Sequence, residues 1–322
     1  MTILLVANED VDFIDSISDT SNTYIGNSIY SRSGIKTANR CVSAYFTPST
    51  TLWLSYFSVQ SVFTEMPNVL FRCTTSSSMI GVGYSALLND ETTTGLALFN
   101  GNDDDGFFLM GGEESNSLGS AGTVNRIDLY VYRYGLSNSS IIGYVNGYQR
   151  IYYSGNLVYG DGGSIDQIMI NLFGTHQVFG FVVATEDTRN MYVKTLAPNA
   201  AGSFSGWTGS YTDINELPIN NTTSIHTEVP DVNFQCNLTG MPGSGSYDIQ
   251  AVTVAYQGIK GTDGIRMKHG FATNGQTVLS SPIDQFSFYS STNQVYTVNP
   301  ATGVAFTPSD INNLQLAFQS IA

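Results

Sequence analysis

Hydrophobic and polar residues alternate along many short stretches of the chain, and this alternation predicts β-strands. In residues 126–132, Ile127, Leu129 and Val131 alternate with polar or amphipathic neighbours, which is the period of two expected of a strand with one buried face. Comparable runs recur roughly every ten residues, a spacing typical of sandwiches and jelly rolls. They lie at 3–7, 24–30, 40–46, 52–62, 69–73, 80–84, 94–99, 106–110, 164–171, 178–184 and 191–196.

One turn in this series is marked by its residue types. Asn146 and Gly147 lie between two β-rich runs, 141–145 and 148–153. A tight type I′ turn requires a positive φ at both central residues, and Asn-Gly is the pair that tolerates it best. The sequence therefore predicts a hairpin here, within a large antiparallel sheet.

The composition changes after the first two thirds of the chain. Residues 197–210 read APNAAGSFSGWTGS, and such a Pro-, Gly-, Ser- and Ala-rich stretch is typical of a domain border. Fewer strands are predicted beyond it, at 232–238, 247–256, 265–269 and 286–289. We therefore predict an all-β chain of two domains, 1–198 and 199–322.

The last residues predict a different local structure. Thr307 followed by Pro308 is the pattern of an N-cap and a first helical position, because proline has no N–H to leave unpaired there. A closing strand is predicted over 316–321.

Charge and composition narrow the function classes. The net charge is −14 with only 12 basic residues, so the sequence does not favour nucleic acid as a direct ligand. Residues 73–125 contain no Lys or Arg and seven acidic residues. They predict an acidic surface that could attract cations or a basic partner, or simply solvated loops. Charged residues make up only 12% of the chain, which suits weakly charged surfaces that pack against other proteins.

The cysteines and the apolar runs indicate the cellular compartment in which the protein is made. Cys41, Cys73 and Cys236 are widely spaced and form no CxxC pair; we interpret them as reduced packing residues, with a Cys41–Cys73 disulfide as the alternative. No run approaches the ~18 apolar residues of a membrane span, and the N-terminus lacks the positive region of a signal peptide. We expect synthesis in a cytoplasm and no membrane insertion.

No catalytic arrangement is visible in the sequence. Glu113 and Glu114 are adjacent, so on a strand they point to opposite faces and cannot flank one glycosidic bond. His176, His226 and His269 are far apart in sequence, and none has the neighbours of a triad or a zinc motif. His269 is interpreted as a surface or half-buried strand residue. We expect the protein not to be an enzyme.

One loop could hold a metal ion. Asn100, Asn102 and Asp104 offer oxygen ligands at alternate positions before Gly106, the arrangement that a hard cation such as Ca²⁺ prefers. The spacing does not match an EF-hand, and an exposed hairpin loop with nothing bound explains the same residues. No other cofactor is expected.

Two aromatic residues are candidates for sugar binding. Trp207 and Tyr211 lie in the glycine- and serine-rich stretch and its continuation, where an exposed ring could stack on a sugar. The alternative is packing, with Trp207 wedged between the two domains.

Several segments together resemble a known family. They are ILLVANEDVDF, IDLYVYRY with IIGYVNGYQRIYYSG, SIDQIMINLF, FVVATEDT with MYVKTLAPNAAGSFSGWT, and the tail VYTVNPATGVAFTPSDINNLQLAFQSIA. The first domain resembles the concanavalin A-like (laminin-G-like) jelly rolls of tailed-bacteriophage structural proteins. The second resembles the small β-sandwich that follows in those proteins.

This resemblance implies a non-enzymatic virion protein, at the tail tip, on a fibre or decorating the capsid. It would lie on the virion surface, form a homo-oligomer such as a trimer, and contact other virion proteins. The alternative is a carbohydrate-binding module that recognises host surface glycans, in a calcium-dependent or calcium-independent manner.

Overall fold

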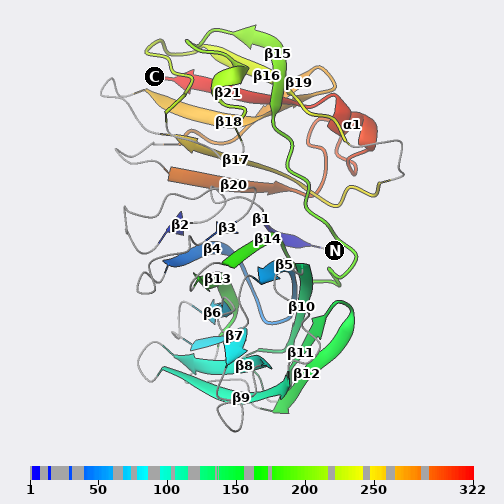
Figure 1. Ribbon diagram of the computed structural model, residues 1–322. Coiled ribbons are helices and arrows are strands. Elements are labelled where there is room, and N and C mark those ends of the chain that lie inside the picture. The colour runs from blue at the N-terminus through cyan, green and yellow to red at the C-terminus, as the bar shows by residue number, and fades with distance from the viewer. Residues whose placement is uncertain are drawn as a thin grey trace. The chain divides into compact units, whose positions relative to one another are not determined.

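The chain forms two compact units, Met1–Val193 (unit 1) and Lys194–Ala322 (unit 2) (Figure 1). Within the residues that the structure describes, no helix is both long and apolar enough to cross a membrane. The computed structural model describes residues 2–7, 14–15, 29–30, 40–60, 68–73, 78–85, 95–102, 106–114, 124–134, 136, 138–155, 163–172, 176–216, 222–241, 247–258, 265–283 and 290–322.

In the described part of unit 1 there are two seven-stranded sheets, whose neighbouring strands are antiparallel. In Figure 1 the green strand β14 lies between the blue strands β1 and β5, although it follows them by more than a hundred residues. The first sheet, sheet A, has the order β1 (Ile3–Ala7), β14 (His176–Ala184), β5 (Leu52–Gln60), β10 (Val124–Tyr132), β11 (Ser139–Val145) and β12 (Tyr148–Gly155), and β3 (Ile29–Tyr30) also pairs with β14.

The second sheet of unit 1, sheet B, completes a jelly roll. The chain crosses from one sheet to the other between β4 and β5, β5 and β6, β9 and β10, β12 and β13, and β13 and β14. Such repeated crossing is the jelly-roll pattern, and it confirms the predicted fold class. The order of sheet B is β2 (Ile14–Asp15), β4 (Arg40–Ser49), β13 (Ile165–Leu172), β6 (Asn68–Cys73), β7 (Ser78–Ser85), β8 (Gly95–Asn102) and β9 (Gly106–Glu114).

The core of unit 1 lies between these sheets. Leu54 and Tyr56 of β5 are buried against Phe71 of β6 and Ile168 of β13, in one continuous cluster. Each large apolar side chain buried in this way contributes about 1.5–3 kcal/mol. The apolar residues of the alternating pattern are therefore those whose side chains point inward from each strand.

The predicted hairpin is present between β11 and β12. Asn146 has φ 51° and Gly147 φ 82°, so both turn residues adopt the positive φ that the Asn-Gly pair predicts. Next to the turn, Tyr144 is opposite Gln149 but Gly143 is opposite Ile151. The residue skipped between them forms a β-bulge, which increases the local twist.

Unit 2 is a smaller sandwich of a five-stranded and a two-stranded sheet. Val254 and Tyr256 of the small sheet are buried in clusters with Phe271 and Phe318 of the large one. The large sheet, sheet C, has the order β15 (Pro198–Ser205), β16 (Asn233–Leu238), β21 (Gln315–Ile321), β18 (Arg266–Thr273) and β19 (Gln276–Leu279); the small sheet pairs β17 (Val252–Gly258) with β20 (Ser290–Tyr296), and a 3-10 helix η2 covers Tyr211–Asp213.

The predicted helical turn is confirmed. The helix α1 (Pro308–Asn312) has Thr307 as its N-cap. The Thr307 hydroxyl accepts from the Asp310 amide at 3.2 Å, and the Asp310 carboxylate accepts from the Thr307 amide at 2.8 Å. These reciprocal bonds form a capping box.

One strand prediction near the border between the units is wrong. Residues 191–196, expected as a strand, have no regular structure. The stretch 197–210, predicted to mark a domain border, contains β15. A Cβ at Gly202 would lie 2.6 Å from the backbone of Gln235, so the small residues of this stretch permit close pairing of an edge strand with β16. Residues 286–289, expected as a strand, lie outside the described residues.

The cysteines lie where apolar packing is required. Cys73 belongs to the core cluster of unit 1 and Cys236 to a cluster of unit 2. Burial raises the pKa of the Cys236 thiol to about 12, which makes it unreactive at neutral pH. The interpretation as packing residues is confirmed for these two, while the side chain of Cys41 is not among those described.

Candidate functional site

Aromatic side chains lie on the outer face of sheet A, the face that points away from the core. On β5, Leu52 and Leu54 are fully buried in the core, so Trp53 between them points outward. Tyr130 of β10 is directly opposite Trp53. The same alternation places Tyr144 of β11 on this face, because Val145 beside it is buried in the core.

These outward rings contact one another. The rings of Trp53 and Tyr130 are stacked with centroids 4.7 Å apart, and those of Trp53 and Tyr144 are stacked at 6.1 Å. Tyr132 adds a tilted contact to Tyr130 at 6.1 Å. We call Trp53, Tyr130, Tyr132 and Tyr144 the aromatic platform. It extends over three neighbouring strands.

The platform continues towards β12, the last strand in the order of sheet A. Ile142 is opposite Tyr130, and Tyr152 of β12 is opposite Ile142. Tyr132 is 40% exposed and Tyr152 61% exposed. Large aromatic side chains that stay open to solvent on one face of a sandwich are a common feature of interaction surfaces.

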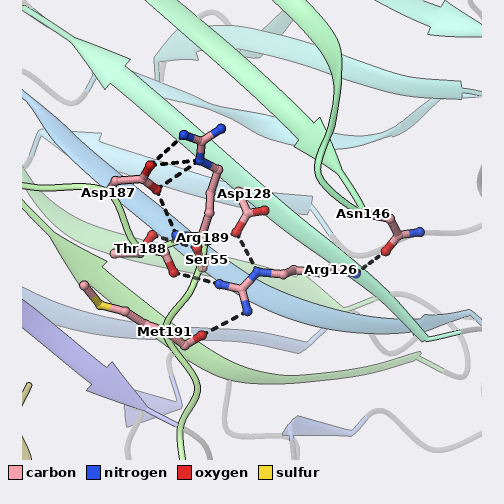
Figure 2. Close-up of polar contacts among 8 residues, drawn as sticks. All are labelled: Ser55, Arg126, Asp128, Asn146, Asp187, Thr188, Arg189 and Met191. Carbon is pink, nitrogen blue, oxygen red and sulfur yellow. Dashed lines mark hydrogen bonds and ion pairs between the residues drawn. The ribbon is translucent and has the colours of Figure 1, made fainter. Parts of the chain in front are cut away.

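A segment of residues 185–193, the cover segment, follows β14 and is fastened to the outer face. The guanidinium of Arg126 donates to the carbonyls of Thr188 at 2.7 Å and Met191 at 2.9 Å (Figure 2). The fully buried Thr188 hydroxyl also hydrogen-bonds the Ser55 hydroxyl at 2.6 Å. Thr185 still makes a backbone bond, from its amide to the Thr2 carbonyl at 3.0 Å, and beyond it the cover segment is held to β5 and β10 by side chains.

Arg126 is also enclosed by aromatic rings. Its guanidinium carbon lies 5.2 Å from the ring centroid of Phe57 and 5.1 Å from that of Tyr192. These two rings contact each other at 6.1 Å. Cation–π contacts of this kind add to the hydrogen bonds that fix Arg126 in place.

Beneath the cover segment lies a buried carboxylate, Asp128, whose side chain is 1% exposed. Its Oδ1 accepts from Ser55 Oγ at 2.5 Å and from Arg126 Nε at 2.9 Å. No hydrogen-bond donor in the described part of the chain reaches its Oδ2. Burial raises the pKa of Asp128, and the bonds from Ser55 and Arg126 lower it in part.

A second arginine, Arg189 of the cover segment, lies directly over the platform. Its guanidinium carbon is 5.0 Å from the ring centroid of Trp53 and 4.9 Å from that of Tyr144. Asp187 accepts from Arg189 Nε at 3.0 Å and from Nη2 at 2.6 Å, and these bonds hold the pKa of Asp187 below its usual value. This pair is exposed, with 39% of the Arg189 side chain and 44% of the Asp187 side chain open to solvent.

The two residues predicted to bind sugar lie in unit 2. The Trp207 ring packs 6.0 Å from Phe318, and its indole N–H donates to the Val232 carbonyl at 3.2 Å. Tyr211 begins η2 and packs against the same hydrophobic cluster. Both rings therefore have packing contacts within unit 2.

The predicted calcium loop is only partly described. Asn100 and Asn102 are in β8, where their backbones pair with Phe108 and Gly106. Their side chains and the whole of Asp104 lie outside the described residues, so calcium binding stays a prediction. Elsewhere in the described chain, no group of three His, Cys, Asp or Glu side chains could hold a metal ion.

Sequence reasoning missed the platform, although one of its signals was visible. Tyr130 and Tyr132 stand at alternate positions in the strand used to predict the fold, on the face opposite Leu129 and Val131. Aromatic residues at two successive outward positions would have indicated an outer face that is not simply solvated. The positions of Trp53, Tyr144 and Arg189 depend on strand order, which alternation does not give.

The sequence matches no known family profile and no curated protein. Among solved structures, the alginate lyase Aly36B is similar at 12% identity and a TM-score of 0.42, over 59% of this chain and 95% of that one. A tetrameric galectin from the ball sponge Cinachyrella sp. is similar at 13% identity and a TM-score of 0.33, over 44% and 96%. The alginate lyase vAL-1 from Chlorella virus is similar at 8% identity and a TM-score of 0.35, over 51% and 88%. These proteins act on or bind carbohydrate, but likeness at this level carries no inference about the function of this chain.

Proposed function

We propose that unit 1 is a carbohydrate-binding module and that the outer face of sheet A is its binding surface. The observation that carries the proposal is the aromatic platform, in which Trp53, Tyr130 and Tyr144 stack across three strands. The register of these strands fixes the rings side by side.

The chemistry of such a surface suits a sugar ring. A pyranose has an apolar C–H face and a polar rim, and Trp and Tyr rings pair a flat apolar face with a polar N–H or O–H at the edge. Stacking therefore buries the apolar face of the sugar while its hydroxyls remain at the rim. Gln149, opposite Tyr144 on β12 and exposed, places an amide at that rim.

The rigidity of the platform favours binding. The rings belong to neighbouring strands of one sheet and are held by backbone pairing, so little conformational freedom is lost when a ligand stacks on them. This location differs from the Trp207 and Tyr211 site expected from the sequence. It is also independent of the loop suggested for calcium, which is on sheet B.

The test is a glycan array on the intact protein, followed by titration of the glycans that bind. Substitution of Tyr130 or Trp53 by alanine should weaken the affinity on the order of tenfold, since each removes a stacking surface worth about 1–1.5 kcal/mol. Tyr148→Ala is the matched control, because Tyr148 is 69% exposed on β12 but is not part of the platform. The absence of glycan binding, or equal binding by the platform variants, would contradict the proposal.

The virion role implied by the sequence resemblance stays a prediction. A carbohydrate-binding module on a phage particle would combine both functions, by attaching the particle to host glycans. Assembly into a homo-oligomer, contacts with other virion proteins and the expectation that the protein is not an enzyme are likewise predictions.

A further inference from the structure

We propose that Arg189 is a displaceable roof over the aromatic platform, and that a sugar displaces it to reach Asp128. The ligand would be a neutral or amino sugar, which donates a hydroxyl or amine hydrogen to Asp128 Oδ2. This inference rests on the proposed carbohydrate site and adds its ligand class and its mode of access.

The position of the roof follows from the strand register. Trp53 is opposite Tyr130, and Tyr144 is opposite Asp128 one row further along β10. The guanidinium of Arg189 lies within 5.0 Å of the Trp53 ring and 4.9 Å of the Tyr144 ring. It therefore spans β10 diagonally and covers faces of both rings on which a sugar would otherwise stack.

Beneath the roof is an acceptor without a donor. The Asp128 side chain is 1% exposed, and its Oδ2 receives no hydrogen bond from the residues that the structure describes. Buried carboxylate oxygens are ordinarily hydrogen-bonded, because an unpaired one loses its hydration without compensation. A ligand that supplies a donor to this oxygen would restore the missing bond.

The two arginines over this face are fastened very differently. Arg126 is 12% exposed and is anchored to Asp128 as well as to two carbonyls of the cover segment. Among the described residues the Arg189 guanidinium hydrogen-bonds only to Asp187, two residues away, and both side chains are exposed. Exposed ion pairs and exposed cation–π contacts are individually weak, so Arg189 can leave the platform while Arg126 holds the cover segment.

The charges beneath the roof select the ligand class. In this proposal Arg189 leaves the platform, and the ligand then reaches the Asp128 carboxylate, whose Oδ2 lacks a donor among the described residues. A uronate sugar would bring a second carboxylate to this oxygen and be repelled. A neutral sugar donates hydroxyl hydrogens, and an amino sugar adds a favourable charge.

The experiment uses the full chain with Trp207→Phe, which leaves Trp53 as the single tryptophan of the two. Its fluorescence is titrated with glucan, glucosamine and galacturonate oligosaccharides of equal length. We expect binding of the glucan or glucosamine probe. Arg189→Ala should bind that probe about 3- to 10-fold more tightly, because the cost of displacing an exposed ion pair and cation–π contact is removed.

Two further variants complete the design. Asp128→Asn places an amide N–H where the ligand needs an acceptor, and it should weaken binding by 10-fold or more. Arg150→Ala, which removes an arginine stacked on Tyr148 outside the platform, should leave the affinity unchanged. Weaker sugar binding by Arg189→Ala, or preferential binding of galacturonate, would overturn the inference while leaving a carbohydrate site in place.

A fluorescence measurement without ligand distinguishes the proposal that Arg189 is a roof from the proposal that the platform binds carbohydrate. Acrylamide quenching of Trp53 should increase in Arg189→Ala if the guanidinium covers the ring, and unchanged quenching would show that there is no roof. Increased quenching with no sugar bound by any variant would overturn the proposed function, and displacement by a sugar with it.

Discussion

At the scale of one residue, the sequence pattern predicts the strand in which His269 lies but not how far its side chain is exposed. Its strand was predicted correctly, since it lies in β18, but its exposure was not. The interpretation as a surface or half-buried residue is wrong, because the side chain is 1% exposed and its ring lies 4.6 Å from that of Tyr256. Burial favours the neutral imidazole and lowers the pKa of His269 to about 4.

This burial predicts a loss of stability in mild acid. The imidazole has a pKa of 6.5 when unperturbed and about 4 in the folded protein, so between these values the unfolded state binds more protons. The unfolding free energy should therefore fall as the pH is lowered through this window, by up to about 3 kcal/mol. Urea denaturation at pH 7.5, 6, 5 and 4 measures this change in the unfolding free energy.

The matched variant for this prediction is His269→Phe, which keeps the ring and removes the titrating group. The difference in pH dependence between the two proteins isolates His269 from carboxylates such as Asp128, whose raised pKa acts in the opposite direction. Parallel curves for the two proteins would contradict the prediction.

At the scale of elements, the cover segment shows how side chains replace strand pairing. Residues 191–196 have a strand-like composition but form no strand. Arg126 of β10 instead hydrogen-bonds the carbonyls of Met191 and of the preceding Thr188. These bonds from Arg126 and the Thr188–Ser55 bond join the cover segment to β10 and β5. These partners are more than sixty residues away in sequence, so no local pattern could indicate them.

Arg126→Met should therefore destabilise unit 1 strongly. The variant keeps an apolar stem but removes two hydrogen bonds to carbonyls and leaves Asp128 buried without its cation, which costs about 3 kcal/mol or more. Arg189→Met, which breaks an exposed pair, should cost less than about 1 kcal/mol. Denaturant unfolding gives both values, and amide exchange should show faster opening of residues 185–193 in Arg126→Met alone. Equal effects of the two substitutions would refute this account of the cover segment.

At the scale of the whole molecule, each hydrophobic cluster is built from residues of one unit. Among the described residues, the core cluster of unit 1 contains none beyond Val183, and both clusters of unit 2 contain none before Leu196. The two sheets of unit 2 pack on each other through Val254 and Tyr256. Each unit thus has the apolar packing that a separate domain requires.

We accordingly expect the fragment 194–322 to fold by itself. It should give a dispersed amide NMR spectrum and one cooperative unfolding transition, because the described strands and clusters of unit 2 consist of residues of that unit. The fragment with Gly270→Ala is a sensitive control, since a Cβ there would lie 2.0 Å from the Val278 carbonyl oxygen and should prevent folding. A fragment that binds hydrophobic dyes and unfolds without cooperativity would show that unit 2 depends on unit 1.

The sequence by itself determined the all-β class, the Asn146–Gly147 hairpin and the Thr307 cap, because alternation, turn chemistry and capping act between residues close in the chain. Only the tertiary structure decided that β15 is a strand, that residues 191–196 are not, and that Trp53, Tyr144 and Arg189 meet. Those outcomes depend on which strands become neighbours, and strand order is settled by packing between residues that are distant in sequence. Apart from the alternation of Tyr130 and Tyr132, the candidate site belongs to this second kind, since its residues come from several strands and the cover segment.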